Sequence, residues 1–292
     1  MWHGCLTALI TPFRPGGDVD YDALAKLVDA QVAAGIDGLV PCGSTGEAAT
    51  LTHEEHGQVV RAVVEMARRR VPVIAGTGSN STAEAVRLTQ EAERAGADGA
   101  LLISPYYNRP PQEGIFRHYE TVAASTRLPL LIYNIPGRTG SNVLPETILR
   151  LARIPNIVGV KEASGSMAQV QEILAACGPD FAVLSGDDNM TLPIMAAGGT
   201  GVIAVTSNLV PERMVALTAA SRAGRLDEAR KLARALLPLM QALMSLDMNP
   251  IPIKTALAMR GQCHEEFRLP LVPMAAAARE RLRGVLEAHG LG

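Results

Sequence analysis

Short, nearly continuous runs of apolar residues alternate along the chain with longer segments whose apolar residues recur every three or four positions. The run at residues 130–134 has the length and composition of a strand that is buried on both faces. The segment at residues 20–34 carries Leu24, Leu27 and Val28 on one side, as an amphipathic helix does. The pattern therefore predicts repeated strand–helix units.

The strand-like runs predict a barrel. We expect strands at residues 5–10, 35–40, 71–75, 100–104, 130–134, 157–161, 181–185 and 201–206. Helical patterns lie at residues 20–34, 54–69, 82–95, 112–126, 145–153, 167–177, 192–197 and 211–223. Apolar strands that are each followed by a helix predict a (β/α)8 TIM barrel. A doubly wound sheet is the alternative, but no GxGxxG fingerprint follows the first strand.

The alternation stops after residue 224. One helical stripe follows, formed by Leu226, Ala229, Ala233, Leu236, Leu237, Met240 and Met244, and two more helical patterns lie at residues 254–260 and 273–288. We therefore expect a barrel at residues 1–224 and a C-terminal helical region at residues 225–292. The Leu and Met side chains of this region are expected to pack and to carry no chemistry.

Composition narrows the class of protein. The 292 residues are 48% hydrophobic, enough for a large core, and the formal net charge of -2 comes without a basic or acidic block. This balance argues against nucleic acid as a partner. The four cysteines form no CxxC pair, and neither a signal peptide nor an apolar run of membrane-spanning length is present. We expect a soluble cytoplasmic protein.

A lysine ends the apolar run at residues 157–161. Burying the Lys161 ammonium is costly unless it is paired or its pKa falls until the amine is neutral and nucleophilic. A neutral amine is what a Schiff base requires. A lysine that reaches solvent from the strand end, or one held in a buried ion pair, is the alternative.

Polar residues also follow three other strands, where a barrel carries its active site. Ser44 and Thr45 stand between glycines, as residues that hold a carboxylate or phosphate do, although a turn with a capping hydroxyl looks the same. Tyr106 and Tyr107 lie in a proline-rich loop that suits binding, a subunit contact or ordinary packing. Tyr133 could move protons near an imine.

Arg138 follows Tyr133 in a glycine-rich loop. Its guanidinium could grip a carboxylate with two hydrogen bonds, or it could simply be an exposed loop arginine. The stretch His53-Glu54-Glu55-His56 reads as a solvated first helical turn with favourable acidic residues. It matches neither the HExxH nor the HxxEH metal motif, so we assign no metal site.

Four motifs together resemble one family. They are GLVPCGSTGE at residues 38–47, YYN at 106–108, YNIPGRTG at 133–140 and VKEA at 160–163. In this order they resemble the dihydrodipicolinate synthase and N-acetylneuraminate lyase superfamily, and within it the dihydrodipicolinate synthases. The resemblance covers essentially the whole chain, including the helical tail.

The resemblance implies an aldolase-type condensation of pyruvate with L-aspartate 4-semialdehyde, on the diaminopimelate route to lysine. Neither a metal nor an organic cofactor is implied, because the iminium itself accepts the electrons. The implied catalytic residues are Lys161 for the imine and Tyr133, Thr45 and Tyr107 for proton transfer, with Tyr107 reaching in from a neighbouring subunit. The implied substrate contacts are Ser44, Thr45, Arg138, Gly186 and Ile203.

The resemblance also implies feedback inhibition by L-lysine at a dimer interface. The residues that match this second site are Ala49, His53, His56, Asn80, Glu84 and Tyr106. A homotetramer built as a dimer of dimers is implied as well. Ala48 departs from the serine expected beside this pocket, and Ser44 departs from the threonine that is commonest in these synthases.

Two other functions remain open from the sequence. One is a pyruvate-dependent aldolase for a sugar acid or a hydroxy-oxoglutarate, which the presence of Arg138 disfavours because a sialic-acid lyase is not expected to carry it. The other is a non-catalytic paralogue that binds a small carboxylate. The intact set of Lys161, Tyr133, Thr45 and Tyr107 disfavours that reading.

Overall fold

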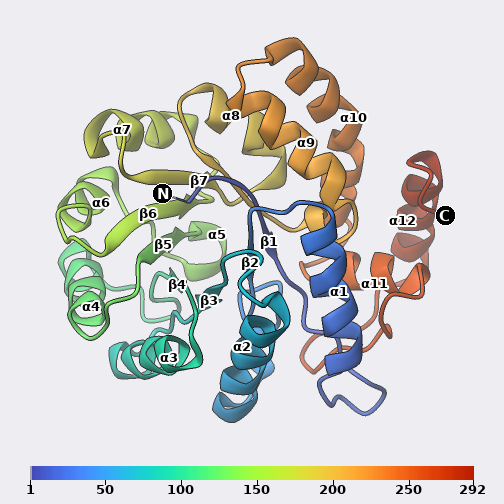
Figure 1. Cartoon of the computed structure of the whole chain (residues 1–292), viewed down its shortest axis with the longest axis horizontal. Helices are drawn as coiled ribbons and strands as arrows, with labels where there is room; N and C mark the ends of the chain where they lie inside the picture. Colours follow the sequence, from blue (N-terminus) through green and yellow to red (C-terminus); the bar gives the residue numbers. More distant parts are fainter. Residues whose placement is uncertain (1) are drawn as a thin grey trace.

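A parallel sheet rolled into a barrel forms the centre of the molecule (Figure 1). The computed structural model describes residues 2–292. The strands are β1 (Gly4–Ala8), β2 (Gly38–Val40), β3 (Ile74–Gly76), β4 (Gly99–Ile103), β5 (Leu130–Asn134), β6 (Ile157–Glu162), β7 (Ala182–Ser185) and β8 (Gly201–Ala204). The order β2-β1-β8-β7-β6-β5-β4-β3, with a parallel bridge from Leu39 to Val73, brings the two end strands together. The expected (β/α)8 TIM barrel is confirmed.

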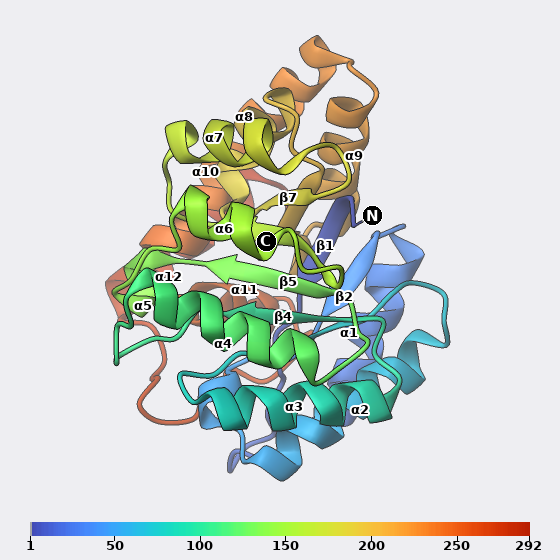
Figure 2. The ribbon, with the colours of Figure 1, turned by 90° about the vertical axis from the view of Figure 1, so that its left-hand side faces the viewer.

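Helices surround the strands and cover their outer side (Figures 1 and 2). They are α1 (Tyr21–Ala33), α2 (His53–Ala67), α3 (Thr82–Ala95), α4 (Gln112–Ala124), α6 (Pro145–Leu151), α7 (Met167–Cys177), α8 (Thr191–Ala196) and α9 (Pro211–Arg222). Local signals set several starts: Thr52 and Glu55 form a capping box at α2, and Ser81 and Ser166 cap α3 and α7. All eight helices correspond to segments expected from the sequence.

Four short helices were not expected. They are α5 (Pro136–Thr139) and three single turns, η1 (Ala48–Thr50), η2 (Asp188–Met190) and η3 (Thr206–Asn208). Each follows a strand, where the chain turns back over the rim of the barrel. A single turn contains too few residues to show a hydrophobic period, so sequence patterning passes over it. Arg138 therefore lies on a one-turn helix rather than in a loop.

Alternation along the strands produces two separate cores. Leu131 and Tyr133 of β5 point into the barrel, whereas Leu130 and Ile132 pack outward against the helices. Tyr133 is in register with Lys161 of β6, while Val160 packs in the outer core. Lys161 therefore faces the interior at the carboxyl end of its strand.

The C-terminal helices lie against one side of the barrel (orange to red in Figure 1). They are α10 (Leu226–Ser245), α11 (Ile251–Met259) and α12 (Ala276–Ala288). Of the expected stripe, Ala229, Leu236 and Met240 are buried in the outer core, whereas Leu226, Leu237 and Met244 are exposed, so the stripe packs only in part. The division into units 1–224 and 225–292 stays a prediction, because these helices share that core with the barrel helices.

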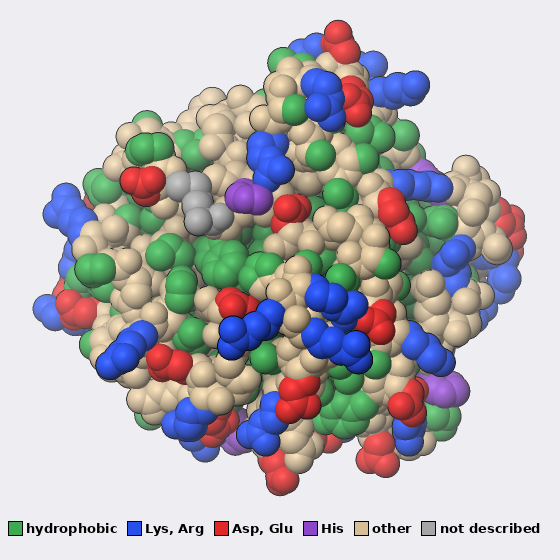
Figure 3. Space-filling view, viewed as in Figure 1, with side chains coloured by type: hydrophobic (Ala, Val, Ile, Leu, Met, Phe, Trp, Pro, Cys, Tyr) green, Lys and Arg blue, Asp and Glu red, His purple; other side chains and the backbone are tan. Residues whose placement is uncertain are grey.

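Charged side chains of both signs are interspersed over the face drawn in Figure 3, in keeping with the balanced composition. Across residues 2–292, no helix is both long and apolar enough to cross a membrane.

Candidate active site

Lys161 and Tyr133 lie next to each other inside the barrel. Their positions pair across β5 and β6, and the Lys161 Nζ lies 4.2 Å from the centre of the Tyr133 ring. Only 5% of Lys161 is exposed. Burial lowers the pKa of Lys161 from 10.5 to about 8, against the opposing effect of Asp188 and Asp187, and Arg138 lowers it further. The amine is therefore poised to lose its proton near neutral pH.

Two carboxylates beside this lysine were not predicted from the sequence. Asp187 and Asp188 follow β7, and burial raises the pKa of both. The Asp188 carboxylate accepts hydrogen bonds from the backbone N–H groups of Val205 (3.1 Å) and Thr206 (2.6 Å), so it fixes the loop after β8. The signal was available, because two consecutive acidic residues directly after a strand pass the same rim criterion that selected Lys161.

Ser44 and Thr45 lie on a tightly turned loop after β2. A Cβ on Gly46 would lie 3.1 Å from both the Cys42 nitrogen and the Leu9 carbonyl oxygen, so the turn needs a glycine. Burial raises the pKa of the Tyr133 hydroxyl, while Arg138 and a hydrogen bond with Ser44 oppose this rise. Within residues 2–292, no hydrogen bond joins Thr45 to Tyr133 or Tyr107. The loop hydroxyl that forms a hydrogen bond with Tyr133 is instead that of Ser44.

Arg138 faces the same space from α5. Its Nη2 donates a hydrogen bond of 2.8 Å to the backbone carbonyl of Asn249, which lies two residues before the start of α11. Gly186 and Ile203 also lie where the sequence places them. A Cβ on Gly186 would lie 3.3 Å from the Lys161 Cε, and Ile203 shares the inner core with Tyr133. Gly186 therefore lies next to the Lys161 side chain, and Ile203 lies in the core that also contains Tyr133.

Tyr107 points away from this site. It is 89% exposed and has a left-handed backbone with φ of 69°. A tyrosine so fully exposed next to a half-buried Tyr106 is unusual for a side chain that only packs. The single chain leaves Tyr107 available to another molecule.

A cavity of about 500 Å3 is lined by residues from both sets that the sequence singled out, although Lys161, Thr45 and Tyr107 are not among its lining residues. Ser44, Tyr133 and Arg138 line one part of it, and the other part is lined by Ala48, Ala49, His53, His56, Glu84 and Tyr106. Asn80 is not among the lining residues, and its carbonyl accepts a hydrogen bond from Asn108. A small polar molecule fits such a cavity.

The second part of the cavity is organised by Glu84. His53 Nε2 lies 2.5 Å from its Oε1, and the Ser79 hydroxyl donates to the other oxygen and holds the pKa of Glu84 below its usual value. His56 is buried, and its Nε2 donates to the Gly76 carbonyl at 2.8 Å. The alternative of a solvated helical turn is therefore wrong for His56, because the α2–β3 packing covers it.

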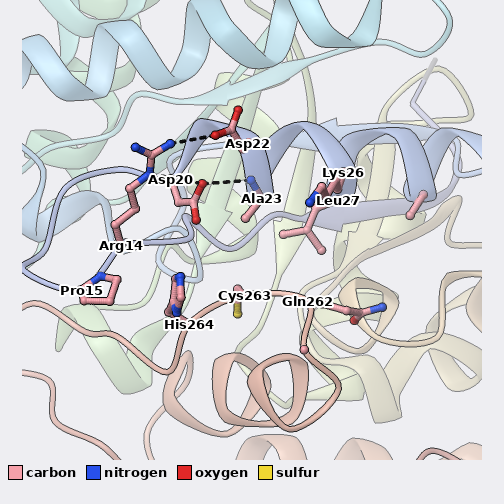
Figure 4. A pocket seen from close by; sticks show the side chains of 12 residues that line it. Arg14, Pro15, Asp20, Asp22, Ala23, Lys26, Leu27, Gln262, Cys263 and His264 are labelled. Atoms are coloured by element: carbon pink, nitrogen blue, oxygen red, sulfur yellow. Dashed lines mark hydrogen bonds and ion pairs between the residues drawn. The ribbon is translucent and has the colours of Figure 1, made fainter.

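Another cavity lies between α1 and the segment after α11 (Figure 4). Two of its charged groups, Arg14 and Asp22, pair at 2.8 Å, and Asp20 accepts from the Ala23 N–H at 3.1 Å. Among the described residues 2–292, no group of three or more His, Cys, Asp or Glu is placed to hold a metal ion.

The site lies in a parallel barrel and contains a buried lysine at the end of the sixth strand that forms no ion pair among residues 2–292. This combination is typical of barrel lyases that act through a lysine nucleophile. The chain belongs to the dihydrodipicolinate synthetase family, whose model matches residues 1–289.

Relatives support this membership over the whole length. The chain is 51% identical to a 4-hydroxy-tetrahydrodipicolinate synthase of Syntrophus aciditrophicus, over 100% of this chain and 99% of the relative. It resembles the chloride-inhibited dihydrodipicolinate synthase of Acinetobacter baumannii complexed with pyruvate, with a TM-score of 0.98, 42% identity and 100% coverage of both chains. It also resembles the enzyme of Cyanidioschyzon merolae with lysine bound, with a TM-score of 0.96, 41% identity and 99% coverage of both.

Proposed function

We propose that this lyase condenses pyruvate with L-aspartate 4-semialdehyde through a Schiff base on Lys161. The activity is that of the 4-hydroxy-tetrahydrodipicolinate synthases, on the diaminopimelate route to lysine. The observation that carries the mechanism is the buried Lys161 amine, which faces the barrel interior beside Tyr133 and forms no ion pair among residues 2–292. A buried amine in this state is nucleophilic near neutral pH.

Each step follows from amine chemistry. The Lys161 amine attacks the pyruvate carbonyl, and loss of water gives the imine. The methyl group then loses a proton, and the resulting enamine carbon attacks the aldehyde, whose oxygen takes up a proton. The substrate amine finally attacks the imine carbon, which closes the ring and releases Lys161. The iminium accepts the electron pair of the broken C–H bond, and the enamine donates it to the aldehyde carbon.

The surrounding groups are proposed to transfer protons and to bind the two substrates. Tyr133, beside the amine, is the proposed proton carrier, with the Thr45 hydroxyl and a Tyr107 from a neighbouring subunit completing the relay. Ser44 and Thr45 are proposed to hold the pyruvate carboxylate, and the carbonyls of Gly186 and Ile203 to border the pocket. Arg138 is proposed to bind the semialdehyde carboxylate.

A coupled assay tests the substrate choice. The enzyme should turn over pyruvate with L-aspartate 4-semialdehyde much faster than it processes a sugar acid or a hydroxy-oxoglutarate. Arg138→Leu should raise the KM for the semialdehyde more than the KM for pyruvate, because only the first substrate is proposed to pair with the guanidinium. Faster turnover of a sugar acid would contradict this function and support the sugar-acid aldolase instead. No turnover of any aldehyde would support the non-catalytic carboxylate-binding protein.

The pKa of Lys161 predicts the pH dependence of imine formation. The neutral amine is the nucleophile, so the rate with pyruvate should rise as the pH increases through about 8. Asp187 raises that pKa by stabilising the ammonium. Asp187→Asn should therefore lower it, move the acid limb to lower pH and increase imine formation at pH 7 by about two- to fivefold.

Stopped-flow measurement of imine formation across the pH range checks this shift. Asp180→Asn is the matched control, because exposed Asp180 precedes β7 at the opposite end of the barrel. A shift of the acid limb to higher pH in the Asp187 variant, or an equal shift in the control, would contradict the assignment of this limb to Lys161.

We also propose that L-lysine inhibits the enzyme by binding around Glu84. The pKa of Glu84 lies below its usual value and its carboxylate already contacts the His53 ring, so an incoming ammonium would take the place of that ring. The support is the cavity that runs from Glu84 and His56 to Ser44 and Arg138. The same loop carries Ser44, Thr45 and Ala49, which gives the bound amino acid a direct contact with the catalytic loop.

Glu84→Ala and His56→Lys should each relieve the inhibition. The first removes the counter-charge and the second adds an ammonium where the ligand ammonium must lie, so the lysine concentration for half inhibition should rise by about tenfold or more. Turnover without lysine should change by less than about threefold, since neither residue contacts Lys161. Titration with L-lysine in the coupled assay measures both, with Glu54→Ala on the exposed side of α2 as control. Full activity of the unaltered enzyme at millimolar lysine would refute the pocket.

We further propose a homotetramer formed from two tight dimers, supported by the exposure of Tyr107. A cytoplasmic location is proposed as well. All four cysteines are free, as expected in a reducing compartment.

A further inference from the structure

Asn249 joins the C-terminal region to two residues of the active site. Its side-chain Nδ2 donates a hydrogen bond of 3.1 Å to the Thr45 Oγ1. Its backbone carbonyl accepts the bond of 2.8 Å from Arg138. Asn249 is buried and lines the cavity that holds Tyr133 and Arg138. One residue of the tail thus contacts a relay hydroxyl and the carboxylate-binding arginine.

The side chain of Asn249 makes no second polar contact. Its Oδ1 is buried and has no hydrogen-bond partner within residues 2–292. An asparagine that only supports the fold normally uses both ends of its amide, because an unpaired buried polar atom is destabilising. The hydrogen bond to Thr45 is the one polar contact of this side-chain amide within residues 2–292. We therefore look for the role of Asn249 in the active site and not in the support of the fold.

The bond restricts what Thr45 can do with its proton. A hydroxyl has one hydrogen to donate and two lone pairs that accept. Asn249 is a donor at Nδ2 and occupies one lone pair. The hydroxyl then has its one hydrogen and one lone pair left. With these it can accept a proton from one tyrosine and donate its own proton to the other tyrosine. Without Asn249 the hydroxyl could rotate among several hydrogen-bonding states.

A buried ion pair fixes the position of Asn249 relative to Thr45. Lys254 of α11 and Glu47 of the catalytic loop are both completely buried, and the Lys254 Nζ lies 2.5 Å from the Glu47 Oε1. The rings of Phe13 and Phe267 lie 4.2 and 5.0 Å from the same nitrogen. The pair ties the start of α11 to the loop two residues beyond Thr45 and so fixes where Asn249 meets the hydroxyl.

We propose that Asn249 is a positioning residue, which orients the Thr45 hydroxyl so that it relays protons in one direction. The proposal rests on the proposed function, since it acts on the same proton relay. It also gives the C-terminal region a part in catalysis beyond packing. The role is exerted through Thr45 and needs no contact between Asn249 and substrate.

Asn249→Asp and Asn249→Ala test the proposal by steady-state kinetics. At neutral pH the new carboxylate accepts the Thr45 proton and withdraws it from the relay. We expect kcat to fall by about tenfold, the order expected for loss of one hydrogen bond, with the KM for pyruvate within about threefold. As the pH falls, the protonated carboxyl becomes a donor again, so the ratio of variant to unaltered kcat should rise. Gln241→Glu, which adds the same charge at an exposed position of α10, should leave kcat within about twofold.

A double-mutant cycle with Thr45→Val separates positioning from general support. If Asn249 acts through Thr45, then Asn249→Ala should reduce kcat by less than about twofold once the hydroxyl is absent. Equal losses in both backgrounds, or an unchanged kcat in Asn249→Ala and Asn249→Asp, would overturn the proposal. If the aspartate variant fails to fold, the alanine variant alone completes the cycle. Failure of the proposed function would differ, because the unaltered enzyme would then give neither an imine nor turnover.

Discussion

Lys161→Arg should reduce turnover by about 10,000-fold or more and abolish the covalent adduct with pyruvate. Arginine keeps the positive charge and much of the volume, but its guanidinium stays protonated and cannot form the imine. A loss of this order follows removal of a covalent nucleophile, because the binding groups that remain supply only a small part of the acceleration. Retained binding of pyruvate in the variant would show that the pocket itself is intact.

Reduction with borohydride in the presence of pyruvate provides the direct measurement. Peptide mapping of the unaltered enzyme should find the adduct on Lys161. The internal control is Lys254, which is buried as well, but whose ammonium is held by Glu47. Because a paired ammonium is a poor nucleophile, Lys254 should stay unlabelled. An adduct on Lys254, or none on Lys161, would refute the proposed mechanism.

Tyr107→Phe should reduce turnover by about a hundredfold, the order expected for loss of a proton-transfer group, although Tyr107 is exposed in the single chain. The effect should act across a subunit boundary. When Tyr107→Phe and Lys161→Arg chains are mixed and allowed to exchange, half of the dimers combine both variants. In those dimers, the Tyr107→Phe chain keeps its own lysine and receives an intact tyrosine from its neighbour.

Mixing should therefore restore about a quarter of the unaltered activity, since one site in half of the dimers is complete. Mixing the Lys161→Arg chain with chains of the unaltered enzyme serves as the control for subunit exchange. No recovery after confirmed exchange would show that Tyr107 acts within its own chain or not at all. A stable monomer with full activity would contradict the shared site as well.

The fold followed from the sequence to within a few residues. Strands that are buried on both faces give continuous apolar runs, and the amphipathic helices between them fix the unit length, so the barrel and the helices α1 to α4 were predictable. The single turns after the strands were not, because they have no hydrophobic period. Placing Arg138 on α5 needed the structure for this reason.

The residues of the candidate site could be selected from the sequence where they stand at strand ends. Lys161, Tyr133, Ser44, Thr45 and Arg138 satisfy the rim criterion, and the structure places them around one space or beside it. Asp187 and Asp188 satisfied the same criterion and were missed. Asn249 satisfied no criterion, because it lies 204 positions from Thr45 in the chain and precedes a helix rather than following a strand.

The sequence by itself determined the barrel and the position of a lysine at the end of its sixth strand, because hydrophobic period and order are properties of the chain. The tertiary structure alone decided what each buried lysine can do. Lys161 and Lys254 both stand in apolar stretches, but Lys161 lies against the Tyr133 ring and forms no ion pair within residues 2–292, whereas Lys254 is bonded to Glu47. The pKa of an amine depends on the dielectric and the charges within a few ångströms, and these neighbours come from distant parts of the chain.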